Sequence, residues 1–429
     1  MEKLNEDFII NLSINKGEPL WMKNFRLNSY KKFLELDNPS FGPKINIDFD
    51  NLVYHKGLFA PPSCSWENVD KKVKNTFNDL GVIEAENKYL KGVSNQYESE
   101  VIYHKMEESD GIIFLSTDEA LKKYPELFEK YFNNLVKYDE NKYTALNGAL
   151  WSGGSFIYIP PYTKVDRPLQ SYFRIDTKNL GQFERTIIIV DHDSSLHYIE
   201  GCTAKNYSTT SLHAGVVEIY VGKNSTCKYS TIQNWSKDVY NLVTKRAILE
   251  EGAYMQWVDG NIGSGVTMKY PSCILKGDNS KASSISIAYA KEGQHLDAGA
   301  KMIHLGKNTK STIISKSIAG FGGTSDYRGT VKIAKDATGS FATIKCDNII
   351  LDNISSSNTY PKNIVENNES TLEHEATISK INEEKLNYLM SLGISEDAAK
   401  DLYVLGFMSD FKKSLPMEYA VELNRLIKE

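Results

Sequence analysis

The sequence is poor in cysteine and holds no closely spaced pair of cysteines. Five cysteines occur among 429 residues, at positions 64, 202, 227, 273 and 346. A disulfide framework would need an even number of cysteines, and a zinc site of the finger type would need closely spaced cysteines. We therefore expect five reduced thiols.

Long apolar runs and an excess of positive charge are also missing. No run of 18 apolar residues occurs, so no membrane-spanning helix is predicted. The first residues, Met1 to Asp7, lack the charged and then apolar pattern of an export signal, so we expect a cytoplasmic protein. The net charge of -5 gives no general affinity for nucleic acid, because such binding requires a basic face.

The motifs of common enzyme classes are absent as well. The Gly-Lys pairs at Gly222 and Gly306 lack the upstream glycine of a phosphate-binding loop, and the Gly-rich segment 147–156 lacks its Lys-Ser/Thr. A carbohydrate-active enzyme would need paired acids along a groove, whereas the aspartates here fall mainly in turns. The sequence therefore predicts no enzyme.

A repeated pattern fills the middle of the chain instead. Between Thr186 and Leu351, short runs of β-branched and aromatic residues alternate with polar turns at steps of 25 to 30 residues. The markers of these turns are Asp193, Gly222, Gly252, Gly277, Gly306 and Lys335. A near-constant step without helical periodicity predicts strands stacked in a solenoid, a β-helix. An ordinary β-sandwich is the rival interpretation.

Helical patterns flank this repeat. The region 1–150 is predicted to hold helices and loops, with Pro19 near one helix start and a capping box formed by Ser116 and Glu119. The β-helix core is assigned to 151–372.

The region 373–429 is predicted to be helical, with one helix from Asn382 closed by Gly393 and two more capped by Ser395 and Ser414. These helices would cover the end of the solenoid or dock a partner.

One cysteine and one acidic tripeptide could hold metal. Cys346 lies beside Lys345, whose ammonium would favour the thiolate if it lay close. Glu373, His374 and Glu375 follow about one repeat step later, so a solenoid brings them near Cys346. A thiolate with a carboxylate or imidazole can ligate iron, although strand cysteines are more often core residues.

Ordered stretches along most of the chain resemble a known family, the SufB/SufD scaffolds of the SUF iron–sulfur assembly system. The similarity is closer to the SufB branch in 301–316 and in Glu-His-Glu-Ala at 373–376. The stretches that carry the resemblance are Glu18–Met22, Ala60–Cys64, Gly181–Thr186, Tyr198–Ala204, Tyr229–Trp235, Val243–Arg246, Lys269–Leu275, Lys301–Lys316, Tyr327–Gly329 and Glu373–Lys380.

This resemblance implies a mainly β protein, a right-handed parallel β-helix between N-terminal and C-terminal helical regions. It implies a non-enzymatic scaffold for iron–sulfur cluster assembly that works with a SufC-like ABC-type ATPase docked on the C-terminal helices. It also implies pairing with a SufD-like paralogue or a second copy, with a transient cluster at that interface. The cluster type, a bound flavin and the sulfur donor are left open.

The resemblance also carries roles onto particular residues. Cys346 matches a proposed cluster-assembly cysteine, Glu375 matches a candidate ligand, and His374 is a weaker one. Glu373 is left as structural. Leu249 stands where family members often carry a sulfur-receiving cysteine, so another thiol would receive sulfur or sulfide would be used directly. The alternative function is a SufD-like subunit that stabilises the complex and holds no cluster.

Overall fold

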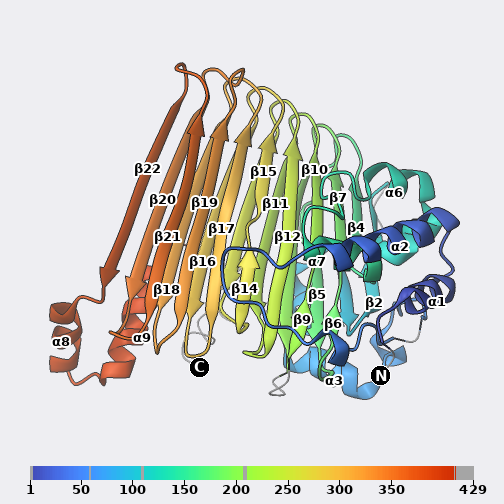
Figure 1. The fold of residues 1–429 in the computed structure, drawn as a ribbon, viewed down its shortest axis with the longest axis horizontal. Helices are drawn as coiled ribbons and strands as arrows, with labels where there is room; N and C mark the ends of the chain where they lie inside the picture. Colours follow the sequence, from blue (N-terminus) through green and yellow to red (C-terminus); the bar gives the residue numbers. More distant parts are fainter. Residues whose placement is uncertain (1–2, 58, 108–110, 206–209, 410, 412–429) are drawn as a thin grey trace.

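Strands stacked in parallel form most of the protein (Figure 1). The computed structural model describes residues 3–57, 59–107, 111–205, 210–409 and 411. The α-helices are α1 (Glu6–Lys16), α2 (Leu20–Glu35), α3 (Lys71–Asp79), α4 (Val82–Tyr89), α5 (Thr117–Lys123), α6 (Pro125–Tyr131), α7 (Lys142–Leu150), α8 (Glu383–Ser391) and α9 (Glu396–Phe407).

The strands are shorter near the start of the chain and reach ten residues in the last turns of the solenoid. They are β1 (Gly92–Tyr97), β2 (Glu100–Met106), β3 (Ile113–Ser116), β4 (Ser155–Ile159), β5 (Leu169–Ile175), β6 (Gly181–Gln182), β7 (Arg185–Val190), β8 (Ser195–Ala204), β9 (Ser211–His213), β10 (Val216–Val221), β11 (Thr226–Asn234), β12 (Val239–Leu249), β13 (Tyr254–Asn261), β14 (Val266–Lys269), β15 (Ser272–Leu275), β16 (Lys281–Ala290), β17 (His295–His304), β18 (Lys310–Ala319), β19 (Thr324–Ile333), β20 (Phe341–Ile350), β21 (Ser356–Val365) and β22 (Thr371–Lys380).

The strands form two sheets, and from β15 to β22 successive strands alternate between them. The first sheet has ten strands in the order β2-β1-β5-β8-β11-β13-β16-β18-β20-β22. The second has twelve, with β21-β19-β17-β14-β12-β10-β7-β4-β3 as its path and β6, β9 and β15 beside it. Only β1–β2 and β3–β4, among the described pairs, are antiparallel. The predicted parallel β-solenoid is therefore confirmed, and the rival β-sandwich is excluded.

The repeated turns have a common backbone conformation. Asp193, Asn224, Asn279 and Asn308 have φ between 55° and 60°, in the left-handed region that Asn and Asp tolerate better than other side chains. Gly252 takes the same place in its turn with φ 67°, and a Cβ there would lie 2.6 Å from the Asn224 Oδ1 atom. Each turn of the solenoid thus requires a residue that tolerates the left-handed conformation. This requirement explains why the polar turns recur at regular spacing.

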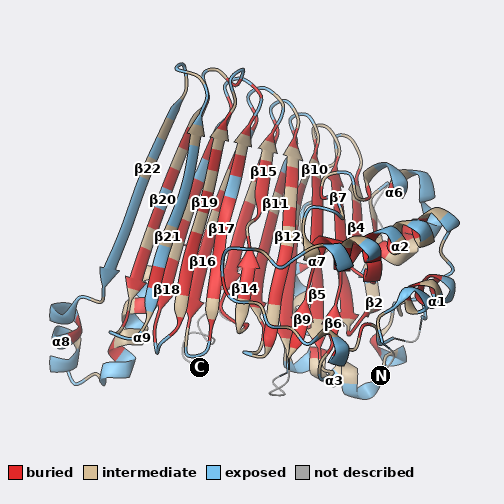
Figure 2. Cartoon of the chain, in the orientation of Figure 1, coloured by how far each residue is buried: buried red, intermediate tan, exposed pale blue. Residues whose placement is uncertain are grey.

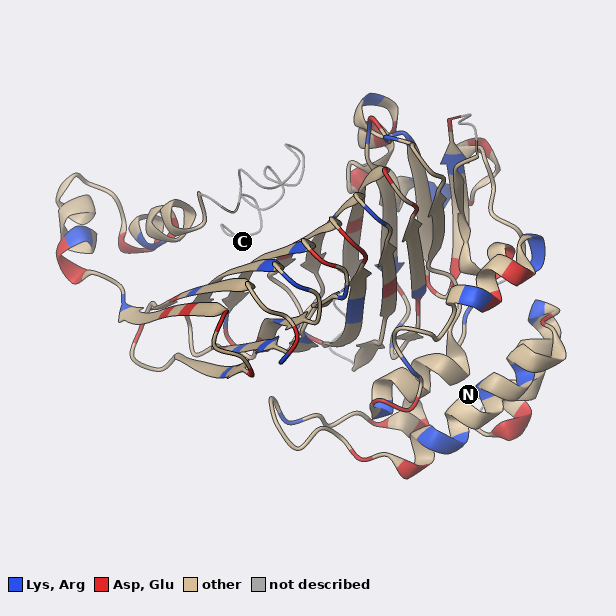
Figure 3. Ribbon diagram, turned by 90° about the horizontal axis from the view of Figure 1, so that it is seen from above, with Lys and Arg blue, Asp and Glu red and all other residues tan. Residues whose placement is uncertain are grey.

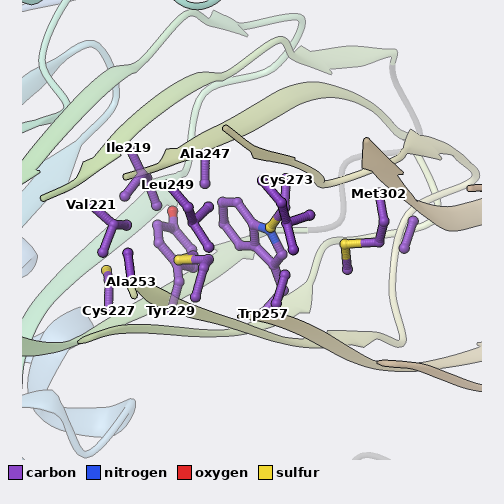
Figure 4. Packing of buried hydrophobic residues seen from close by; sticks show 14 of the residues in the cluster. Ile219, Val221, Cys227, Tyr229, Ala247, Leu249, Ala253, Trp257, Cys273 and Met302 are labelled. Carbon is purple, nitrogen blue, oxygen red and sulfur yellow. The ribbon is translucent and has the colours of Figure 1, made fainter. Parts of the chain in front are cut away.

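The space between the two sheets, the lumen, is filled by alternate side chains of both walls. Its apolar part packs residues from successive turns, including Tyr229, Leu249, Trp257 and Met302 (Figure 4). These four residues are at most 1% exposed. Cys346 belongs to the same cluster and is buried to the same degree. Burial of this apolar surface along the solenoid axis supplies the main stabilisation of the stacked turns.

Helices and a long loop cover the outer faces. The helices α2 and α7 lie over the second sheet, and residues 36–55 cross it (Figure 1). The Tyr240 hydroxyl donates to the carbonyl of Asn46 at 3.2 Å within this crossing. On the first sheet, α9 packs Val404 and Met408 against Ile318 and Ile349. None of the described helices is long and apolar enough to cross a membrane.

The predicted helix starts agree with the structure. Ser116 Oγ accepts from the Glu119 amide at 3.2 Å, at the start of α5. Asn382 and Ser395 cap α8 and α9 through their side chains, and Gly393 follows α8 with φ 84°. The further helix expected at Ser414 lies outside the described residues.

Two expected region boundaries differ from the observed elements. The strands β1 to β3 lie before residue 150 and extend both sheets, because β1 pairs with β5 and β3 with β4. At the other end β22 continues the solenoid to Lys380, so the acidic tripeptide after residue 372 is strand rather than the start of the helical region. The alternating inward Leu372 and His374 follow strand periodicity, and helical residues begin at Glu383.

Among the described residues, no helix covers the C-terminal end of the solenoid, which we call its open end. Most residues of β21 and β22 are exposed, whereas the strands before them are largely buried (Figure 2). The helix α9 lies on the outer face of the first sheet, so it leaves this end uncovered. Along the ribbon, lysine and arginine positions are interspersed with aspartate and glutamate positions (Figure 3).

Candidate metal centre

Cys346 occupies the second-last strand of the first sheet. It points into the lumen, is 0% exposed and packs within the lumen cluster. In the parallel pair of β20 and β22, its register partner is Ala376, while Lys345 faces Glu375 and Ile344 faces His374. The sequence-predicted residues are thus on adjacent strands, as the repeat step required.

Glu375 and Cys346 lie on opposite faces of their sheet. The Glu375 carboxylate is 3.7 Å from the Lys345 ammonium, and the two side chains are 65% and 49% exposed. The expectation that Lys345 would favour the Cys346 thiolate is wrong, because neighbouring residues of a strand point to opposite faces. An exposed pair of this kind contributes little to stability. Glu373 lies on the same outer face and is also exposed.

His374 shares the inner face with Cys346. Its ring is half-buried, and its Nδ1 atom lies 3.1 Å from the Asn363 Nδ2 atom of β21. The Nε2 atom is buried and has no hydrogen-bond partner among the described residues. A buried ring nitrogen without a hydrogen-bond partner on the inner face is available to a ligand, although His104 and His213 also have a buried Nε2 atom without such a partner.

The Cys346 thiol is held in its protonated form. Burial raises its pKa to about 12, while the hydroxyl of Tyr327 acts in the opposite direction and Asp347 adds to the increase. A thiol with this pKa carries almost no thiolate at neutral pH, and thiolate is the form that binds metal. The Cys346 thiol must therefore become exposed to solvent before it can lose its proton and bind metal.

The described part of one chain does not complete a metal site. Among the described residues, no three His, Cys, Asp or Glu side chains are gathered closely enough to hold an ion. Cys346 lies on β20, one strand from the end of the first sheet, and His374 lies on the end strand β22, where Ala376, the register partner of Cys346, is exposed. The arrangement can offer a thiolate and an imidazole to iron, and further ligands have to come from outside.

The remaining cysteines occupy different surroundings. Cys64 is exposed, and Cys202, Cys227 and Cys273 are buried as expected for core thiols. Leu249, which stands at the apparent position of the family cysteine, is fully buried in the apolar part of the lumen (Figure 4). A polar sulfur carrier at position 249 would lack solvent and polar neighbours.

Native thiol labelling tests this distribution. With an uncharged alkylating reagent at pH 8, we expect Cys64 to react at least about tenfold faster than Cys346, because only Cys64 is exposed. Mass spectrometry of peptides after short reaction times would measure both rates. Labelling of all five thiols in denaturant is the control. Comparable native rates for Cys64 and Cys346 would contradict the burial described above.

A buried group of charges inside the lumen was not predicted from the sequence. The Lys245 ammonium is 2.9 Å from the Glu200 carboxylate, and the Lys269 ammonium is 2.9 Å from Asp259. All four side chains are at most 2% exposed. Cys202 contacts the Glu200 Oε1 atom at 3.7 Å, so it is the described thiol that lies next to this charged group.

Hydrogen bonds complete the surroundings of Glu200. The hydroxyls of Tyr229 and Thr231 both donate to its carboxylate. Burial alone would raise the pKa of Glu200, but Lys245 and the Tyr229 hydroxyl lower it to about 2, so the carboxylate stays ionised. A signal for this group exists in the sequence: Glu200 and Lys245 lie two residues from the inward Tyr198 and Ala247, so the strand period places both charges inward.

Comparison with known proteins points to one family. The family described as "SUF system FeS cluster assembly, SufBD core domain" matches residues 173–407. The family described as "SufBD protein N-terminal region" matches residues 68–171. Together the two matches cover most of the chain, including the candidate metal centre.

Curated relatives agree with these matches. The iron-sulfur cluster assembly protein SufB of Bacillus subtilis is 53% identical over 429 residues, which cover 99% of this chain and 92% of that protein. A SufBD family protein of Staphylococcus saprophyticus and one of Staphylococcus aureus, both named for iron-sulfur cluster assembly, are each 54% identical with the same coverage.

Proposed function

Because the chain belongs to the SufBD family of SUF-system iron–sulfur cluster assembly proteins, we propose that it is a scaffold on which a cluster is built and from which it is transferred. It acts as a subunit of a complex with a SufC-like ATPase and is not itself an enzyme. The iron–sulfur cluster is its cargo.

The observation that carries this proposal is the pair of Cys346 and His374 on the inner wall next to the open end. The two lie on adjacent strands, and the orphaned Nε2 of His374 faces the same lumen as the thiol. In the proposal Cys346 holds iron and sulfide, and His374 is the second ligand of the chain. Glu375, ranked first from the sequence, lies outside and serves as a ligand only after the strand end rearranges.

A second subunit would supply the missing ligands. Among the described strands, β21 and β22 are the end strands of the two sheets and pair with no further strand, and such edges pair readily with another chain. A SufD-like paralogue or a second copy seated there would close the lumen over Cys346. The cluster would then form between the two chains.

The ATPase would act through the C-terminal helices. The Lys316 ammonium donates to the carbonyl of Phe407 at 2.7 Å, which ties α9 to β18, the strand next to β20. ATP binding or hydrolysis in a partner docked on α8 and α9 could then shift the last strands and uncover the thiol. The fully buried, protonated state of Cys346 supports a scaffold that is closed between cycles.

The cysteines bear on both the sulfur route and the cellular location. Leu249 carries no thiol, so sulfur reaches the site through another cysteine or as sulfide. All five cysteines are free, which suits a reducing compartment, and we place the protein in the cytoplasm.

A SufD-like subunit that holds no cluster is the second candidate. The specific observation in its favour is the complete burial of Cys346, which resembles an ordinary core cysteine. Such a subunit would stabilise the complex without binding iron.

Anaerobic titration of iron and sulfide into the chain with its ATPase, without a paralogue, separates the two functions. The scaffold proposal predicts bound iron and sulfide together with visible cluster absorbance and an assembly containing two copies of this chain. The same titration of the ATPase alone is the control. Stoichiometric complex without iron or cluster absorbance would instead support the SufD-like function.

A further inference from the structure

The loop of residues 36–55, which we call the crossing loop, joins the N-terminal region to the outer face of the second sheet (Figure 1). It is fixed on both sides of Phe41. The Tyr143 hydroxyl donates to the loop at 2.7 Å before this residue, and the Tyr240 hydroxyl donates to it at 3.2 Å after this residue. Phe41 is thus held at a defined place on the sheet.

Gly42 brings the crossing loop against the strands. Its φ of 81° lies in the left-handed region, which favours glycine. A Cβ atom there would lie 2.8 Å from the Met268 Cε atom of β14 and 3.0 Å from the Asp297 Oδ2 atom of β17. A larger residue at this position would therefore lift this part of the loop, together with Phe41, off the sheet.

Phe41 contacts a side chain that links the last three strands of the second sheet. The Arg328 guanidinium of β19 lies 5.1 Å from the centre of the Phe41 ring. It lies 4.0 Å from the centre of the Tyr360 ring of β21, and its Nε atom donates to the Asp297 Oδ2 atom of β17 at 2.7 Å. The Arg328 side chain is only 23% exposed, so its attraction to the two rings is partly shielded from water.

The strand β21 depends on side-chain contacts of this kind. It is the end strand of its sheet and pairs there with β19. Most of its side chains are exposed, so burial of apolar surface adds little to its stability. Another outer contact joins the Asn358 Nδ2 atom of β21 to the Asp326 Oδ1 atom of β19 at 2.7 Å. The contact of Tyr360 with Arg328 is the one that continues to the crossing loop.

We propose that the crossing loop is a latch for β21: the Phe41 ring holds the Arg328 guanidinium against the Tyr360 ring, and this contact keeps the end strand paired with β19. When the loop is lifted, Arg328 turns toward solvent and β21 opens more often. A protein that binds the loop and lifts Phe41 would loosen the edge on which a second chain is proposed to pair. This consequence rests on the proposed function, whereas the latch itself does not.

Amide hydrogen exchange followed by mass spectrometry tests the latch on the chain alone, without iron, sulfide or ATPase. In Phe41→Ala we expect peptides of β21 to exchange about threefold faster, because loss of one ring beside a cation lowers the free energy of local opening. Gly42→Ala should have the same effect by lifting the loop. Peptides of β18, in the opposite sheet, should keep their wild-type rates in both variants.

Leu34→Ala is the control for the loss of an exposed apolar side chain. Leu34 lies in α2 and is 63% exposed, and its removal should leave the exchange of β21 unchanged. Wild-type exchange of β21 in both Phe41→Ala and Gly42→Ala would overturn the inference.

A double substitution shows whether the effect passes through Arg328. Arg328→Lys keeps the positive charge near Asp297 but loses the planar group that contacts the rings, so β21 should exchange faster. Adding Phe41→Ala to Arg328→Lys should then give little further increase, because the two residues act in one chain of contacts. A full additional threefold increase would show that the loop does not act through Arg328, and the proposed latch would be wrong.

Discussion

Cys346→Ser should reduce cluster formation by at least about tenfold when the chain is reconstituted anaerobically with its ATPase, iron and sulfide. Serine has nearly the same size, so the buried site keeps its packing, but a hydroxyl does not replace thiolate as a ligand in iron–sulfur chemistry. Visible absorbance and the iron and sulfide content of the purified complex would measure the loss.

Cys273→Ser is the matched control for this variant. Cys273 is also fully buried in the lumen and accepts a contact from the Trp257 indole nitrogen at 3.2 Å, far from the open end of the solenoid. We expect it to assemble clusters at close to the wild-type level. Wild-type cluster content in Cys346→Ser, with a correctly formed complex, would remove Cys346 from the site.

Lys245→Met should destabilise the fold by about 3–5 kcal/mol, because it leaves the Glu200 carboxylate in the lumen without its positive partner. Methionine preserves most of the volume of lysine, so packing changes little. For a chain of this length, this loss corresponds to a decrease in Tm of roughly 4 °C, measurable by calorimetry.

An exposed ion pair provides the control for the Lys245 prediction. The Lys223 ammonium is 2.8 Å from the Glu251 carboxylate, but the side chains are 54% and 55% exposed. Lys223→Met should therefore change stability by less than about 1 kcal/mol. Equal effects of the two substitutions would show that burial does not strengthen the Lys245 pair.

The same pair makes stability depend on pH. The pKa of Glu200 is lowered to about 2 in the folded chain, against about 4.3 for an unfolded glutamate. A carboxyl with a lowered pKa contributes stability that is complete above the unfolded value and is lost as the pH falls toward the folded value. The contribution of Glu200 is thus present at neutral pH and disappears between about pH 4.5 and pH 2.

The fold was predictable because its determinants are local and repeated. Each corner requires a left-handed residue, and Asp193, Asn224, Asn279 and Asn308 mark these corners in the sequence at nearly regular steps. The strand runs between them have no helical period. These two signals together predict stacked turns, and the capping residues Ser116 and Ser395 likewise predict their helices.

The faces of the site residues could not be predicted in the same way. The repeat step varies along the chain, and a change of one residue moves a side chain to the other face. The observed register pairs Cys346 with Ala376, which turns His374 inward and Glu375 outward. The repeat step predicted that the acidic tripeptide lies near Cys346. Which of His374 and Glu375 shares the inner face with Cys346 depends on the strand register, which the sequence does not specify.

The buried charges escaped prediction for a related reason. Glu200, Lys245, Asp259 and Lys269 come from four different strands, and none has an opposite charge within two residues in the sequence. Only the stacking of the turns places them in contact. No single window of sequence shows that a negative group meets a positive one.

The stacked architecture also limits the free energy needed to expose the Cys346 thiol to solvent. Each rung of the solenoid touches only its neighbours, so fraying of the terminal strand β22 breaks its pairing with β20 and leaves the earlier rungs intact. Because Cys346 lies directly beneath this strand, peeling back one rung would bring it to solvent. Opening and reclosing could therefore recur in every working cycle without general unfolding of the chain.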